Sequence, residues 1–209
     1  MIEGRLIKIT RKYEGFPVLA IFICPIKIKI TTPMRRVVFI FGSIAGVIVV
    51  GLMYMLFSIG QDSSDFGTGE LLGYLSMIIA LSTIFFGVKS YRDSLGGVIS
   101  FGKALLVGVL ITLVASVIYI IGWEIYFNFF YSDFSQEYLT HSVEKLKASG
   151  VSGAELEKQV TEMKEMSDLY TNNVFFRMLI TLIEILPVGV IISLISAALL
   201  RKKEFLPAS

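Results

Sequence analysis

The sequence predicts an all-α fold: a polytopic membrane protein with four transmembrane helices and an extracytoplasmic helical hairpin between the third and the fourth. Three observations support this fold class. Hydrophobic residues make up 55% of the 209 residues and charged residues only 17%, whereas a soluble domain carries about 25% charged residues. The apolar residues form four long runs, each long enough to cross a bilayer as a helix. A polar stretch of helical periodicity separates the third run from the fourth.

The composition also excludes several function classes. The net charge of +2 is too small to indicate a nucleic-acid partner. The single cysteine, Cys24, and the single histidine, His141, cannot form an intramolecular disulfide, a cysteine metal cluster or a two-histidine metal motif. The sequence also contains no G-x-x-x-x-G-K-[ST] phosphate-binding loop. We therefore expect no cofactor, no metal and no enzymatic activity.

Residues 1–33 are predicted to be an N-terminal extension outside the membrane domain. Their one apolar run, residues 16–26, contains Pro17 and Pro25 and is too short to span a bilayer. No small-x-small cleavage motif follows it. We interpret the extension as poorly ordered or as a misassigned start, with Met34 as the natural first residue. The alternative is an amphipathic segment that anchors the chain at the membrane surface.

The first predicted span covers residues 37–59 and follows Arg35 and Arg36. Within it, Gly42 and Gly46 form a G-x-x-x-G motif, a spacing that lets helix backbones approach closely in lipid. We expect this motif to pack against another span of the same chain. The alternative is a dimer interface.

The second predicted span covers residues 71–88, an uncharged run. It lies between an acidic loop, residues 61–70, and a basic loop, residues 89–103, in which Gly96-Gly97 indicates a turn. The third predicted span covers residues 104–127. Its first 20 residues carry no charge, which corresponds to a helix of about 30 Å.

The polar stretch at residues 128–173 is predicted to be a helical hairpin. Its four lysines and eight acidic residues give it a net negative charge. Two helices are expected, at about residues 133–148 and 153–170, with Ser152 and Glu155 placed as a capping box at the start of the second. An apolar stripe along the second helix, which would pack on the first, consists of Leu156, Val160, Met163 and Tyr170.

The fourth predicted span covers residues 174–200 and completes a membrane domain at residues 34–203, with residues 204–209 as a cytoplasmic tail. Lysines and arginines cluster before the first span, between the second and third, and after the fourth, whereas the loop at 61–70 has none. The positive-inside rule therefore places both termini in the cytoplasm and the hairpin outside. Trp123 and Phe127 would belong to the outer aromatic belt.

Three segments together resemble a known family. They are SYRDSLGGVISFGKAL (90–105), ITLVASVIYIIGWEIY (111–126) and EILPVGVIISLISAALLRKK (184–203). With the four spans, they are similar to a bacterial membrane-protein family described only as a domain of unknown function, over about Met34 to Lys203. The resemblance implies a location in the bacterial cytoplasmic (inner) membrane. It implies no activity.

Glu184 is the candidate intramembrane site, together with Thr181 on the same helix face and Pro187 one turn later. It lies about ten residues, or 15 Å, inside the fourth span. Acids at such depth are costly and often mark a function, and a proline interrupts the hydrogen bonding of its helix and favours a bend. We consider two interpretations, a hydrogen-bonded residue that holds helices together and a proton-relay or transport site.

Two further groups of residues are predicted to meet across the third and fourth spans. Glu124 and Arg177 both lie near the outer boundary, so we expect them to form an ion pair; the alternative is a binding site for a polar ligand. Small residues recur at spacing four in both spans and are expected to pack closely. They are Gly108, Thr112 and Ser116 in the third span, and Gly189 and Ser193 in the fourth.

From these features we expect a non-enzymatic accessory, scaffold or sensing subunit that acts through its hairpin. Its partners would be the lipid bilayer and either a second copy of the chain or another membrane protein. The alternative function is a small oligomeric proton-coupled carrier or channel that uses Glu184.

Overall fold

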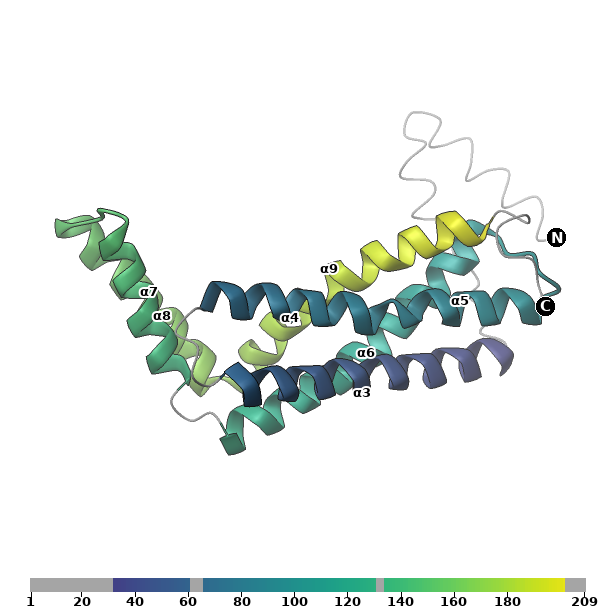
Figure 1. Cartoon of the computed structure of the whole chain (residues 1–209), viewed down its shortest axis with the longest axis horizontal. Coiled ribbons are helices and arrows are strands. Elements are labelled where there is room, and N and C mark those ends of the chain that lie inside the picture. The colour runs from purple at the N-terminus through teal and green to yellow at the C-terminus, as the bar shows by residue number, and fades with distance from the viewer. Residues whose placement is uncertain (1–31, 61–65, 131–133, 202–209) are drawn as a thin grey trace, which may run out of the picture. The chain divides into compact units, whose positions relative to one another are not determined.

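The computed structural model describes residues 32–60, 66–130 and 134–201, and these residues are almost entirely helical. The predicted N-terminal extension and C-terminal tail therefore lie outside the described residues, apart from Thr32 and Pro33. The all-α fold class is confirmed for the described part of the chain. The helices, labelled in Figure 1, are α3 (Thr32–Gly60), α4 (Phe66–Leu81), α5 (Thr83–Ser94), α6 (Phe101–Phe130), α7 (Phe134–Ala148), α8 (Gly153–Asn172) and α9 (Val174–Leu200).

Four helical stretches are long and apolar enough to cross a membrane: Pro33–Ser58, Leu71–Ser94, Phe101–Phe129 and Val174–Leu200. The four predicted transmembrane helices are thereby confirmed as candidate spans. Their outward faces carry large apolar side chains such as Val47, Ile79 and Ile183, each more than half exposed. Such faces are stable only where lipid covers them, so the chain is a membrane protein.

The second span differs from the prediction because it consists of two helices and is longer. A turn at Ser82 separates α4 from α5. The Ser82 hydroxyl donates to the Ile79 carbonyl at 2.6 Å, and the Thr83 hydroxyl donates to the Ala80 carbonyl at 2.7 Å. Hydroxyl side chains that bond to nearby carbonyls in this way compete with the regular helix, which accounts for the position of the break.

Helix α5 continues past the predicted end at Val88 and includes three charged residues. Lys89 and Asp93 lie one turn apart, and their Nζ and Oδ2 atoms are 2.6 Å apart. Because these charges pair on the helix itself, the helix does not end where the uncharged run ends. The predicted turn follows, with positive φ angles of 82° at Gly96 and 84° at Gly97, a conformation that favours glycine.

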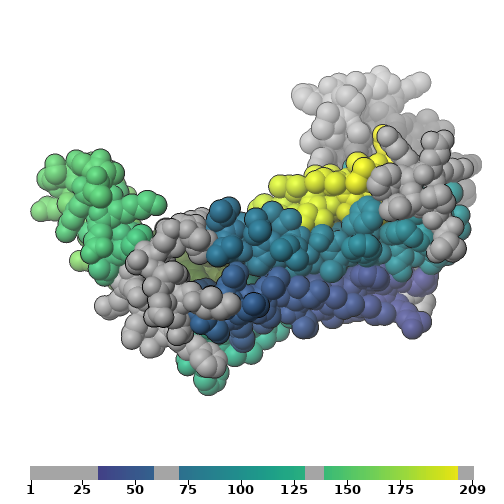
Figure 2. All heavy atoms as spheres, in the orientation of Figure 1, coloured from purple at the N-terminus to yellow at the C-terminus, as the bar shows by residue number. Residues whose placement is uncertain are grey.

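Helix α6 is the central element, because it packs along both α3 and α9, while α4 and α5 pack against α3 and α9 from one side. Figure 2 shows the face on which α3, α4–α5 and α9 form the surface and cover most of α6. The two glycines of α3 face α6. An added Cβ would lie 2.6 Å from Val114 Cβ at Gly42 and 2.7 Å from Ile118 Cβ at Gly46. The G-x-x-x-G motif thus serves packing within the chain, and the same chain covers the face that a dimer would need.

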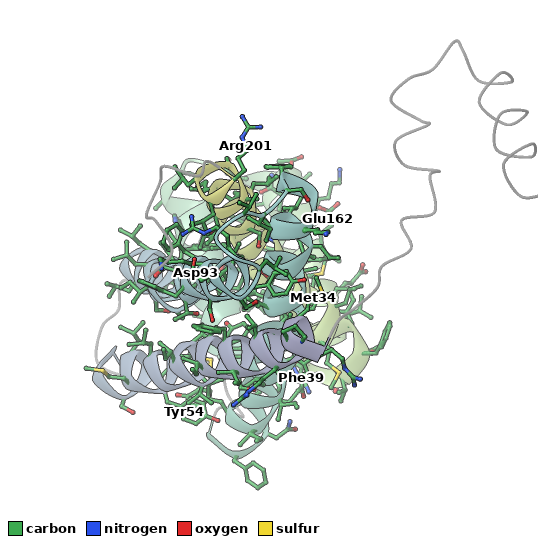
Figure 3. The ribbon with its side chains drawn as sticks, turned by 90° about the vertical axis from the view of Figure 1, so that its right-hand side faces the viewer. Met34, Phe39, Tyr54, Asp93, Glu162 and Arg201 are labelled. Atoms are coloured by element: carbon green, nitrogen blue, oxygen red, sulfur yellow. The ribbon has the colours of Figure 1, made fainter. Side chains whose placement is uncertain are left out.

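One end of the bundle is basic. Figure 3 views the bundle from the end at which Met34, Asp93 and Arg201 lie. Arg35 and Arg36 follow Met34, and Lys89 and Arg92 lie within one turn of Asp93, so these cations share that end. We call it the basic end, and we call the opposite end, where α8 joins α9, the α8 end.

Helices α7 and α8 pack against each other, and no residue of α8 is fully buried. The turn between them contains Gly150, with φ 88°. The predicted capping box is wrong in one respect. Ser152 occupies the N-cap position, but its side chain makes no capping hydrogen bond. Gly153, the first residue of α8, has φ 64° and not a helical φ angle, so the first turn that the Ser152 hydroxyl would cap is irregular.

Candidate functional site

Helices α6 and α9 pack as one antiparallel pair with a continuous register. An added Cβ at Gly108 would lie 2.7 Å from Ser193 Cβ, and one at Gly189 would lie 2.7 Å from Thr112 Oγ1. Farther along, Glu124 of α6 pairs with Arg177 of α9. Between successive contacts, the residue number rises along α6 by the same amount as it falls along α9. The small residues and the ion pair therefore belong to a single seam.

The part of the seam with small residues is a packing contact. Thr112 Oγ1 donates to the Gly108 carbonyl at 3.0 Å and lies 3.5 Å from Ser193 Oγ. Ser193 Oγ donates to the Gly189 carbonyl at 2.7 Å, and Ser116 Oγ donates to the Thr112 carbonyl at 2.8 Å. These buried hydroxyls find acceptors on their own helices, so the two backbones can approach closely at no cost in unsatisfied polar groups.

At the α8 end of the seam, the structure brings Arg177 and Glu124 together in a bidentate pair. Arg177 Nε donates to Glu124 Oε1 at 2.8 Å, and Arg177 Nη2 donates to Glu124 Oε2 at 2.7 Å. The Arg177 side chain is 1% exposed and that of Glu124 is 13% exposed. A guanidinium and a carboxylate in this geometry form two parallel charge-assisted hydrogen bonds. Each residue compensates the charge that the other buries.

Arg177 also holds the end of α8. Its Nη1 donates to the carbonyls of Tyr170 at 2.8 Å and Thr171 at 3.1 Å, both in the last turn of α8. Carbonyls in a last helical turn have no partner within the helix, and a positive charge there is favourable. Only Asn173 separates α8 from α9, and its side chain accepts from the Phe176 amide at 3.0 Å. Arg177, in the first turn of α9, therefore lies close enough to bond to the carbonyls in the last turn of α8.

Aromatic side chains complete this arrangement. Trp123 Nε1 donates to the Tyr170 hydroxyl at 2.7 Å, and Arg177 Cζ lies 4.1 Å from the centre of the Phe127 ring, a favourable cation–π distance. Burial raises the pKa of Tyr170 to about 12, and the negative charge of Glu184 acts in the same direction. The Tyr170 hydroxyl therefore keeps its proton at neutral pH. We call these five residues, Trp123, Glu124, Phe127, Tyr170 and Arg177, the Arg177 cluster.

Sequence reasoning identified the ion pair but missed the link to α8. The sequence pattern predicts Tyr170 in an apolar stripe between the two hairpin helices, whereas its hydroxyl contacts Trp123 of α6. A signal was present in the sequence, because Arg177 lies five residues beyond the end of α8. A cation so close to a helix C-terminus is a common cap.

The candidate intramembrane residues lie farther along α9. Thr181 is buried, and its hydroxyl donates to the Arg177 carbonyl at 2.9 Å. Glu184 is half-buried on the same helix. Helix α9 continues as one helix through Pro187 to Leu200. The acid thus lies seven residues, or about two helical turns, from Arg177 along α9.

A family model described as "Protein of unknown function (DUF4199)" matches residues 40–202. The chain belongs to the DUF4199 family. The resemblance to a family of unknown function is therefore confirmed, and the match includes α4 to α9 with both Glu184 and the whole Arg177 cluster. No curated protein and no solved structure matches this DUF4199 chain.

Elsewhere in this DUF4199 chain, the basic end carries a second charged group. Arg92 is fully buried, and its Nε and Nη2 donate to Asp93 Oδ1 at 3.2 Å and 3.1 Å. Lys89 shares the same carboxylate. Within the described ranges, no group of three or more histidine, cysteine, aspartate or glutamate residues is arranged to hold a metal ion. The Arg177 cluster and the neighbouring Glu184 are thus the candidate functional site.

Proposed function

We propose that this DUF4199 chain is a non-enzymatic membrane protein, an accessory, scaffold or sensing subunit that acts through α7 and α8. The observation that carries the proposal is the double role of Arg177. One guanidinium pairs with Glu124 inside the bundle and caps the last turn of α8. A displacement of α8 therefore acts on the seam between α6 and α9. Such a joint suits a protein that relays or resists movement between an exposed element and its membrane part.

The proposed location is the bacterial cytoplasmic membrane, with both termini inside and α7–α8 outside. The cations at the basic end support this orientation, since lysine and arginine favour the cytoplasmic side of short connections. The α8 end, where Trp123, Phe127 and Tyr170 gather, would then lie at the outer membrane boundary. Tryptophan and tyrosine are typical of that position.

The exposed surface of α8 supports a partner-binding role. Helix α8 has no fully buried residue, and its charged side chains point outward, as in the Lys158–Glu162 pair, whose side chains are 69% and 64% exposed and whose charged atoms are 4.0 Å apart. Such an exposed pair adds little stability to the fold. The partner that we propose is another membrane protein or a second copy of the chain.

Photocrosslinking tests this role. A photoreactive amino acid in place of Glu157 or Glu162 is expected to give a discrete light-dependent protein adduct in native membranes. Leu194, an apolar residue of α9 that is 41% exposed, provides the matched control and is expected to give lipid adducts only. If Glu157 and Glu162 give no protein adduct while the variants insert normally, the partner-binding role is contradicted.

A second candidate function is the proton-coupled carrier. The observation that favours it is the position of Glu184, a half-buried acid inside the span Val174–Leu200, two turns from Arg177. A carboxylate that changes its protonation at this depth would move charge within the bundle. An oligomer would be needed, since four spans are few for a carrier.

Proton flux tests the carrier function. Under an imposed pH gradient, proteoliposomes with the native chain are expected to change their internal pH, and those with Glu184→Gln are not. The matched control is Glu162→Gln on α8, which should behave as the native chain does. Equal behaviour of liposomes with and without the native protein would exclude proton movement and leave the partner-binding role unaffected.

A further inference from the structure

The basic end carries much more positive than negative charge. Its only acid among the described residues is Asp93, which already binds both Arg92 and Lys89. Four further cations lie at this end, and all of them are exposed: Arg35, Arg36, Lys103 and Arg201. The ion pairs formed among the described residues include none of these four. The described part of the chain therefore leaves their positive charge unneutralised.

Helices α3 and α6 run parallel, so both begin at the basic end. Gly42 of α3 lies against Val114 of α6, and Gly46 lies against Ile118. Between these two contacts, the residue number rises by the same amount along both helices. The two helices therefore keep one register along the seam that they share.

This register brings Arg35 and Lys103 to the same end of the seam. Arg35 lies seven residues before Gly42, on the face of α3 that meets α6. Lys103 lies eleven residues before Val114, on the face of α6 that meets α3. Along the bundle, Lys103 is therefore about four residues, or 6 Å, beyond Arg35. Both belong to the first turn of their helices, so the backbone holds the two cations where one anion can contact both.

An exposed apolar surface continues from these cations along α3 and α6. Phe39, one turn from Arg35, is 58% exposed, and Val117 of α6, next to the seam, is 57% exposed. Phe39 is seen from the basic end in Figure 3, together with Met34 and Arg201. Lipid acyl chains cover such a surface in a membrane. Cations at the end of an apolar surface match a phospholipid, in which a charged headgroup is followed by acyl chains.

We propose that the basic end binds an anionic phospholipid where α3 and α6 begin. Arg35 and Lys103 hold the headgroup phosphate, Arg36 adds positive charge beside it, and the acyl chains lie over Phe39 and Val117. Basic sites between transmembrane helices bind anionic headgroups in this way. A phospholipid satisfies both the cations and the apolar surface, whereas free phosphate would satisfy only the cations. The site lies at the opposite end from the Arg177 cluster, so the proposal does not depend on the role of α8.

The experiment is a titration of the full chain in a neutral detergent with phosphatidylglycerol, followed by native mass spectrometry. Phosphatidylcholine with the same acyl chains is the reference, and we expect only phosphatidylglycerol to bind with saturation. Arg35→Gln together with Lys103→Gln should weaken this binding about 30-fold, because each cation at a lipid surface contributes about fivefold. The matched control, Lys158→Gln with Lys164→Gln, removes two exposed cations of α8 and should bind as the native chain does.

Three outcomes would overturn the proposal. Equal binding of both lipids would show that the site does not select a negative headgroup. Unchanged binding in the double variant would place the lipid elsewhere. Displacement of the lipid by sodium phosphate, but not by sodium chloride of equal ionic strength, would show that free phosphate is the ligand. Thermal unfolding without added lipid shows whether each variant folds. If the double variant does not fold, Arg35→Gln alone decides, with an expected fivefold loss.

Discussion

Replacing Arg177 by alanine is expected to destabilise the protein by about 3–5 kcal/mol, the range observed when one partner of a buried ion pair is removed. The substitution leaves the Glu124 carboxylate, which is 13% exposed, without its counter-ion. It also leaves the carbonyls of Tyr170 and Thr171 without the donor that caps α8. The free energy of unfolding in mixed detergent micelles measures the loss.

A double-mutant cycle separates the ion pair from the cap. Glu124→Ala together with Arg177→Ala should cost less than Arg177→Ala alone, because the double variant buries no unpaired carboxylate. The missing cap is common to both and cancels in the comparison. Additive losses from the two single variants would contradict the pairing. Arg35→Ala, at an exposed position of α3, serves as the control for the loss of a cation and should change the stability little.

Removal of Arg177 should weaken the attachment of α8 to the bundle more than the packing of α6 against α9. The seam between α6 and α9 contains tight contacts far from the cluster, such as that of Gly189 with Thr112. These contacts keep the two spans together when the cluster is lost. The junction with α8 includes the hydrogen bonds of Arg177 to the last turn of α8, the bond of Trp123 with Tyr170, and the edge contact of the Phe127 and Tyr170 rings. We therefore expect α7 and α8 to detach from the bundle before α6 and α9 separate. A relay between α8 and the bundle requires this behaviour.

The ion pair could be predicted because membrane topology restricts where charges lie. Two opposite charges near the same boundary, on spans adjacent in sequence, have few other partners. The cap of α8 could not be predicted in the same way. It depends on α8 and α9 being separated by a single residue, Asn173, and helix ends are the least certain feature of a sequence-based prediction. The sequence placed Tyr170 correctly on a helix but could not decide which neighbour it faces.

The second span shows the same limit. The length of the uncharged run located the span, but Ser82 and Thr83 divide it through hydrogen bonds to Ile79 and Ala80, and Lys89 and Asp93 extend it by pairing. The break and the extension both depend on local hydrogen-bond geometry, which a hydropathy pattern does not predict. The glycines of α3 are similar, because their spacing predicts a close approach of backbones, whereas only the structure shows that α6 is the helix that approaches.

The seam between α6 and α9 gives the second large prediction. Gly189→Ala is expected to destabilise the protein by about 1–3 kcal/mol, the usual cost of overpacking. The added methyl group would collide with the side chain of Thr112. Thr112 is fully buried and held by its bond to the Gly108 carbonyl at 3.0 Å, so it cannot rotate away at little cost. The free energy of unfolding is again the quantity to measure.

Gly51→Ala is the matched control, because nothing lies within 4 Å of a Cβ added there. It should stabilise its helix or leave it unchanged, since alanine favours a helix over glycine by up to about 1 kcal/mol. A second variant tests the cause. Thr112→Ala added to Gly189→Ala removes the colliding atoms and should recover part of the loss. If Gly189→Ala is as harmless as Gly51→Ala, then α6 and α9 do not meet at this register.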